Sequence, residues 1–240
     1  MKYILLFSLL FTLSCHQTKN VKKETEKIKT EIKEKEKTQE ELVVVLKNPK
    51  NVVDAKALIE NSSLIWSELV IDNTTLKAAL IKVPVAKTTF WIDRLQKSNT
   101  FSSVEVKTSN SINVIKDISE NTFLKIRKTH CSGHCTVYDA TLLKDGRVIF
   151  NGIENVLIKG KQEFTISKTR MKKLQETFSK TSFGKYFDSY IDKSLMDYPS
   201  TFITHDNKEI EIKLWKYVPL ELVLAYEDFE NVLFEKKMIE

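Results

Sequence analysis

The sequence contains few of the residues that mark specialised protein classes. Glycine and proline number only 5 and 4 in 240 residues, which excludes collagen-like and low-complexity chains. The 3 cysteines are too few for a scaffold held together mainly by disulfides. No glycine-rich phosphate loop, Gly-x-Ser-x-Gly or His-Glu-x-x-His motif occurs. The chain therefore lacks the signatures of these common catalytic classes.

The overall composition is typical of a folded protein. Hydrophobic residues make up 42% of the chain, and the formal net charge is +6. This composition and length suit one large domain or two small ones. The positive excess is too diffuse to indicate nucleic-acid binding.

The first 14 residues have the layout of an export signal. Lys2 supplies a positive charge, an uncharged run extends from Tyr3 to Leu13, and the small residue Ser14 precedes Cys15. The run is shorter than the roughly 20 residues that a membrane-spanning helix needs. Residues 12–15 resemble the signal of bacterial lipoproteins. An ordinary signal peptide, with Cys15 present by coincidence, is the alternative.

The lipoprotein resemblance implies that residues 1–14 are removed and that Cys15 is lipidated. Two or three acyl chains on one residue anchor a protein durably, so we expect the membrane as a partner. We expect the bacterial outer membrane, with the protein facing the periplasm, because the residues after Cys15 lack an early acidic cluster. That compartment also excludes nucleic acid as a partner.

Residues 15–41 are predicted to form a charged, flexible tether. Between Lys19 and Glu41 the chain has eight Lys and seven Glu, and Val21, Ile28 and Ile32 are its only aliphatic residues. A short coiled coil is the alternative, but two apolar positions at helical spacing do not make the three or four heptads it needs. The segment is best interpreted as a solvated spacer.

Residues 42–107 show the pattern of a small domain of β-α-β-β-α-β order. Asn51 is a candidate N-cap for the first helix. Strands are expected at residues 42–46, 69–71, 78–83 and 101–106, and helices at residues 54–60 and 87–97. This order suits a ferredoxin-like sandwich. The predicted fold class of the whole chain is α+β.

The polar residues 108–120 are predicted as a linker or a weak strand, and residues 121–240 as an α+β domain. Asp145 and Gly146 predict a tight hairpin turn, and Ser167 is a candidate cap for a helix. Pro219 is expected to open the last helix. Strands are expected at residues 123–127, 137–143, 147–150, 156–158, 163–166, 201–204 and 209–215. The result is an antiparallel sheet with two packing helices.

A motif near the start of this second domain resembles a known family. Cys131, Gly133, Cys135 and Tyr138 fit the pattern Cys-x-Gly-x-Cys-Pro-x-Tyr, with Thr136 at the proline position. This pattern is similar to that of an uncharacterised domain family of bacterial lipoproteins, and the likeness covers about residues 121–237. The resemblance implies an envelope location and no known activity.

The same motif holds the only concentration of reactive side chains: His130, Cys131, His134 and Cys135. In an exported protein, two cysteines four residues apart would normally form a structural disulfide. A tetrahedral zinc site with these four residues as ligands is a second possibility, although adjacent residues rarely converge on one ion. A redox-active pair is the third, although the spacing and loop context differ from those of thioredoxin-like enzymes.

We expect a non-catalytic binding or scaffold protein that needs no cofactor and holds an envelope protein or component near the membrane. The alternative is a metal- or thiol-handling protein built on the His130 to Cys135 loop. Phe183, Tyr186, Phe187 and Tyr190 would share one face of a helix. Core packing is the favoured interpretation of these aromatic residues, and a binding platform is the alternative.

Overall fold

The computed structural model describes residues 38–192, 194 and 197–240. These residues form two sheets, each combined with helices, and all strand pairs but one are antiparallel. The predicted α+β class is therefore confirmed. The predicted signal peptide, Cys15 and the tether as far as residue 37 lie outside the described residues.

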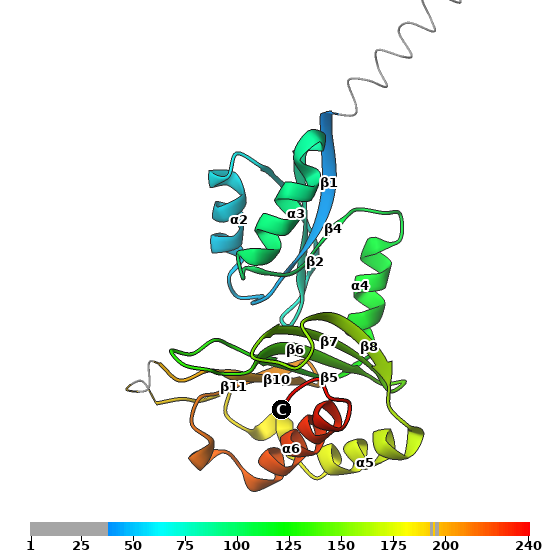
Figure 1. Ribbon diagram of the computed structural model, residues 1–240, viewed down its shortest axis with the longest axis vertical. Coiled ribbons are helices and arrows are strands. Elements are labelled where there is room, and N and C mark those ends of the chain that lie inside the picture. The colour runs from blue at the N-terminus through cyan, green and yellow to red at the C-terminus, as the bar shows by residue number, and fades with distance from the viewer. Residues whose placement is uncertain (1–37, 193, 195–196) are drawn as a thin grey trace, which may run out of the picture.

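The first sheet, called sheet A here, has four strands in the order β2-β3-β1-β4. Helices α2 and α3 cover one of its faces (Figure 1). The elements are β1 (Gln39–Leu46), α2 (Val52–Asn61), β2 (Ile65–Asp72), β3 (Lys77–Pro84), the short 3-10 turn η2 (Val85–Lys87), α3 (Thr88–Lys97) and β4 (Phe101–Val106). We call these residues, 39–106, the N-terminal unit.

Strand β1 is buried on both of its faces. Leu42 and Val44 pack in the core beneath α2 and α3, whereas Val43 and Val45 belong to an apolar cluster on the opposite face. A strand that is buried on both faces needs a continuous apolar run instead of alternation, and β1 has one. Asn51 occupies the N-cap position of α2 but makes no side-chain capping hydrogen bond.

The predicted linker contains a helix, α4 (Ser111–Glu120), and the weak-strand interpretation is wrong. Ile112 and Ile115 recur at helical spacing and pack against the outer face of sheet A. Ser, Asn and charged residues surround this stripe, which is why the segment resembles a linker in the sequence. Figure 1 shows α4 running between the two sheets.

The second sheet, sheet B, has seven strands in the order β8-β7-β6-β5-β10-β11-β9. Helices α5 and α6 pack on one face, and the N-terminal unit lies over the other (Figure 1). The elements are β5 (Thr122–Lys128), β6 (Val137–Leu143), β7 (Arg147–Glu154), β8 (Gly160–Thr165), α5 (Lys168–Ser179), η3 (Phe183–Lys185), β9 (Ser189–Tyr190), β10 (Thr201–His205), β11 (Lys208–Ile212), η4 (Trp215–Tyr217) and α6 (Leu220–Glu235). Residues 122–240 are the C-terminal unit.

Two predicted turn and cap residues act as expected in this unit. Gly146 has a φ of 91°, a conformation that glycine adopts readily, and it closes the hairpin of β6 and β7. The Ser167 side chain accepts a hydrogen bond from the Arg170 backbone N–H at the start of α5. Helix α6 begins directly after Pro219.

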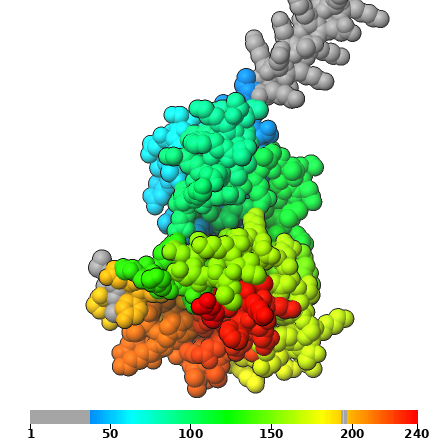
Figure 2. All heavy atoms as spheres, in the orientation of Figure 1, coloured from blue at the N-terminus to red at the C-terminus, as the bar shows by residue number. Residues whose placement is uncertain are grey.

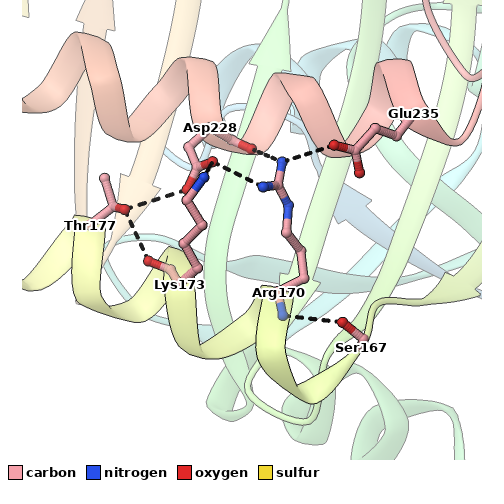
Figure 3. Close-up of polar contacts among 6 residues, drawn as sticks. All are labelled: Ser167, Arg170, Lys173, Thr177, Asp228 and Glu235. Carbon is pink, nitrogen blue, oxygen red and sulfur yellow. Dashed lines mark hydrogen bonds and ion pairs between the residues drawn. The ribbon is translucent and has the colours of Figure 1, made fainter.

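A polar cluster joins α5 to α6 at the surface of the core (Figure 3). Asp228 of α6 is buried and receives hydrogen bonds from Lys173 at 3.1 Å and from Thr177 at 3.4 Å. Arg170 lies 3.3 Å from the same carboxylate and 3.5 Å from Glu235. The buried carboxylate is therefore paired, as a buried charge requires.

The strand predicted at residues 156–158 is wrong. This segment makes bends, and the backbone N–H groups of Leu157 and Ile158 both donate to the Met238 carbonyl. Val156 and Ile158 pack against the main core, so docking explains their apolar character without a strand ladder. No helix within the described ranges is long and apolar enough to span a membrane.

Candidate functional site

The face of sheet B that lies beneath the N-terminal unit is polar. Along β5, Leu124 and Ile126 point into the core, so Lys125 and Arg127 point to the opposite face. Asp139 of β6 lies directly across from Arg127 in the antiparallel register. The strand alternation thus places opposite charges side by side on this outer face.

A cleft of about 800 Å³ lies between this face and the N-terminal unit. That volume falls within the range of small-molecule binding sites. Floor residues on neighbouring strands of sheet B include Lys125, Asp139, Thr141, Ile149, Asn151 and Thr204. Strand β4 and the β2–β3 loop contribute from the N-terminal unit, so both units build the cleft.

Helix α4 supplies an apolar wall of the cleft. Val114, Ile115 and Ile118 all line the space. Val114 is 46% exposed, and no residue of α4 is fully buried. An amphipathic helix normally buries its apolar face, so this partly open face can take the apolar part of a ligand.

Charged groups beneath the N-terminal unit are incompletely paired. The Arg127 side chain is only 7% exposed, stacks on the Phe202 ring and lies 3.7 Å from Glu209. Its Nε and Nη2 atoms are buried without hydrogen-bond partners, and so is Oδ1 of Asp139. Most buried polar atoms in folded proteins are hydrogen-bonded, so these atoms are unusual.

Two lysines belong to the same charged region. Burial lowers the pKa of Lys47, which extends from the N-terminal unit, and it also lowers the pKa of Lys125; the Asp139 carboxylate opposes both shifts. Lys47 donates a hydrogen bond to Asn99. Within the described residues, the Lys125 side chain makes no hydrogen bond or ion pair, although the Asp139 and Glu209 carboxylates act on it electrostatically. Its ammonium group is available to a ligand in the cleft.

An ion pair connects the two units beside the cleft. Lys161 of β8 lies 2.9 Å from Glu105 of β4. The hydrogen bond from Lys161 lowers the pKa of Glu105. Both residues line the cleft. The space-filling view shows the N-terminal unit above the yellow-green residues of the C-terminal unit (Figure 2).

The cysteine and histidine loop has a different arrangement. Cys131 and Cys135 lie at disulfide distance, with Cα atoms 5.9 Å apart. His130 Nδ1 lies 2.7 Å from Glu154 Oε2, and His134 is exposed. Among the residues that the structure describes, no group of three or more His, Cys, Asp and Glu side chains is placed to hold a metal ion. The structure therefore does not assemble the four-ligand site.

A further histidine, His205, and the aromatic residues from 183 to 190 also have defined places in the structure. His205 lies away from the cysteine loop, where Nδ1 is 2.7 Å from the Phe123 carbonyl oxygen and the ring contacts Phe178 and Phe183. Phe183 is buried in a short 3-10 turn, whereas Phe187 is 76% exposed. The aromatic residues from 183 to 190 therefore do not share one helical face.

Tyr138, the last residue of the sequence motif, is fully buried beneath α6. Its hydroxyl donates to Glu230 Oε1 at 2.7 Å, and Lys128 Nζ lies 3.0 Å from the same oxygen. Burial raises the pKa of Tyr138, and the nearby Glu230 carboxylate adds to the effect. The motif tyrosine thus fixes β6 to α6.

Sequence reasoning missed the cleft and its charged floor. Alternation in residues 123–127 does indicate that Lys125 and Arg127 share one face of a strand. Nothing in the sequence shows that a second folded unit covers that face. The apolar stripe of α4 is a detectable signal, because Ile112, Ile115 and Ile118 recur every three residues.

The comparisons with known proteins bear on the C-terminal unit. Residues 122–233 match the family model Domain of unknown function (DUF6438). This agrees with the expectation of an uncharacterised domain family in that part of the chain. No curated protein and no solved structure matches the chain.

Proposed function

We propose that this chain is a lipid-anchored, non-catalytic binding protein of the bacterial envelope and that the cleft between its two units is the binding site. The main observation that supports this proposal is the cleft, whose volume is about 800 Å³. It combines a polar floor that contains incompletely paired charges with an apolar helical wall. Such a mixture is typical of a site that binds and orients a small molecule.

The anchoring part of the proposal rests on residues 1–15. The likeness to lipoprotein signals supports acylation of Cys15 and attachment to the outer membrane with the protein facing the periplasm. In cells given labelled palmitate, the wild-type chain should carry label and sediment with membranes. The Cys15→Ser variant should lose the label; a variant that keeps it would contradict the proposal.

We also propose two structural assignments. The antiparallel order β2-β3-β1-β4, with α2 and α3 on one face, supports a ferredoxin-like arrangement for the N-terminal unit. The separation of Cys131 and Cys135 supports a structural disulfide in the exported protein. No specific observation favours the alternative of a metal- or thiol-handling protein.

Ligand screening of the full-length chain tests the binding site. We would measure thermal unfolding with a panel of amino acids, short peptides, sugars, carboxylates and phosphates. At least one class should raise the unfolding midpoint, because a ligand that binds only the folded state stabilises it. Thr141→Trp, which fills the cleft floor, should abolish the rise, whereas Thr169→Trp, at an exposed position of α5, should keep it.

Two outcomes would contradict the binding site. Either no class of molecule raises the midpoint, or Thr141→Trp responds to every active class as strongly as Thr169→Trp does. A turnover activity that is lost in Cys131→Ser would contradict the non-catalytic part of the proposal.

A further inference from the structure

We propose that the cleft binds an α-amino acid, or a molecule that ends in one, with an apolar substituent. Asp139 would receive the α-ammonium group and Lys125 the α-carboxylate, while α4 would contact the substituent. This inference rests on the proposed function, since it names the ligand of the same cleft.

The register of sheet B places the two residues on neighbouring strands and on the same face. Lys125 lies across from Thr141, and Asp139 is two residues before Thr141 on β6. Lys125 and Asp139 are therefore diagonal neighbours on one face, with Cα atoms about 7–8 Å apart. In the proposed complex, a ligand whose two charges are separated by a single carbon atom bridges the two side chains.

Among the described residues, neither side chain makes a direct ion pair, although the Asp139 carboxylate acts on Lys125 and on Lys47 electrostatically. Lys125 and Asp139 both line the cleft, yet they form no ion pair with each other within 4.0 Å. Asp139 also makes no hydrogen bond to Arg127, its direct neighbour across the strands, and its Oδ1 atom is buried without a partner. A buried carboxylate oxygen without a hydrogen bond is costly, so a ligand group that donates one to Asp139 is favoured.

A ligand with a single charge would leave one of these groups uncompensated. A simple carboxylate could pair with Lys125 but would bring a second negative charge close to Asp139. A simple amine could pair with Asp139 but would add a positive charge to the region of Lys47, Lys125 and Arg127. Like charges at short range in a desolvated site repel strongly, so the zwitterion fits best.

The substituent would contact the apolar wall. Val114, Ile115 and Ile118 line the cleft from α4, and Ile149 lies on the floor. These side chains offer a surface for an aliphatic or aromatic group. Thr141 and Asn151 add uncharged hydrogen-bonding groups to the floor.

Three probes of matched shape test this inference on the wild-type full-length chain by calorimetric titration. L-Phenylalanine carries both charges, phenethylamine only the ammonium group, and 3-phenylpropionate only the carboxylate. L-Phenylalanine should bind at least about tenfold more tightly than either of the other two. No variant is needed for this comparison, so it does not depend on the folding of a mutant.

Two variants then test whether Lys125 and Asp139 are the side chains that bind the charged groups of the ligand. Lys125→Met and Asp139→Asn should each weaken L-phenylalanine binding about tenfold or more. The controls Lys172→Met and Asp93→Asn, whose charges lie on exposed faces of α5 and α3, should leave it unchanged.

The possible failures separate the two levels of the proposal. If 3-phenylpropionate binds as tightly as L-phenylalanine and Asp139→Asn has no effect, the zwitterion proposal is overturned, although the cleft remains a binding site. If L-phenylalanine does not bind while another class in the panel does so in a Thr141-dependent way, the ligand class is again wrong. If nothing in the panel binds in the cleft, both proposals fall.

Discussion

A lysine on the solvated face of a strand keeps its ammonium group hydrated, but Lys125 lies beneath a second folded unit and its burial lowers its pKa. Asp139 lies on the same face and has a buried oxygen without a partner. The same two residues on an uncovered sheet would be ordinary surface charges. This part of the polar face of sheet B is therefore a candidate site because the N-terminal unit covers it.

Gly152 is required by close packing and not by its backbone conformation. A Cβ atom there would lie 2.0 Å from the Ile158 carbonyl oxygen, because the bent segment after β7 returns over this strand. Gly152→Ala should lower the free energy of unfolding by about 1–3 kcal/mol in chemical denaturation. Gly184→Ala, where no atom lies within 4 Å, should change it by no more than about 0.5 kcal/mol. Equal losses in both variants would contradict this account.

Tyr138 stabilises the contact between β6 and α6 through its hydroxyl. Tyr138→Phe keeps the buried ring but removes one of the hydrogen bonds to the Glu230 carboxylate, which keeps Lys128 and Tyr226 as partners. We expect a loss of about 1.5 kcal/mol in the free energy of unfolding. Tyr217→Phe is the matched control, since Tyr217 is 67% exposed, and it should have almost no effect. An unchanged stability in Tyr138→Phe would show that the hydroxyl has no stabilising role.

At the scale of elements, the polar cluster between α5 and α6 stabilises the packing of these two helices. Asp228 has a side chain only 10% exposed and contacts Arg170, Lys173 and Thr177. Asp228→Asn should lower the free energy of unfolding by about 2–3 kcal/mol, because it weakens charge-assisted hydrogen bonds at a buried position. The measurement is urea denaturation at neutral pH.

Glu235 provides the control within the same cluster. It also lies near Arg170, but its side chain is 61% exposed. Glu235→Gln should therefore cost no more than about 1 kcal/mol. A larger loss in Glu235→Gln than in Asp228→Asn would reverse the proposed order of importance.

Elements with local signals were predicted well from the sequence. Strands β4 and β6 have the predicted bounds, because clear apolar periodicity and turn residues delimit them. Gly146 and Ser167 act on residues that are close to them in the chain, so the sequence is sufficient to predict their roles. Helix α4 and the bends at residues 155–158 depend on long-range docking, so their local composition misled the prediction.

The candidate site was harder to predict than the elements for the same reason. Its charged floor comes from β5 and β6, and its apolar wall comes from α4. No short motif connects these segments. The motif at Cys131 concentrates reactive side chains in the sequence, but the structure brings its cysteines to each other and pairs His130 with Glu154.

At the scale of the whole molecule, the first described strand begins far from the C-terminal unit. Strand β1 begins at the end of the N-terminal unit that points away from the C-terminal unit (Figure 1). An anchor at Cys15 would thus be joined, through the predicted tether, to the end of the N-terminal unit that lies away from the C-terminal unit.

The ion pair of Glu105 and Lys161 should make the contact between the units sensitive to acid. The Lys161 hydrogen bond lowers the pKa of Glu105, so its stabilising contribution is complete above the ordinary glutamate pKa of about 4.3. This contribution is lost as the pH falls through the lowered value. Glu105→Gln should remove that part of the pH dependence of unfolding, and Glu176→Gln, at an exposed position of α5, should retain it. Identical profiles for Glu105→Gln and the wild type would contradict the prediction.

The most direct test of the cleft as the binding site is nuclear magnetic resonance of the full-length chain with labelled isoleucine methyl groups. The probe is the panel molecule that raises the unfolding midpoint most. We predict saturable shifts at Ile115, Ile118 and Ile149, which line the cleft, and none at Ile59 or Ile210, which lie in the two cores. Shifts confined to isoleucines outside the cleft, such as the exposed Ile191, would contradict the account.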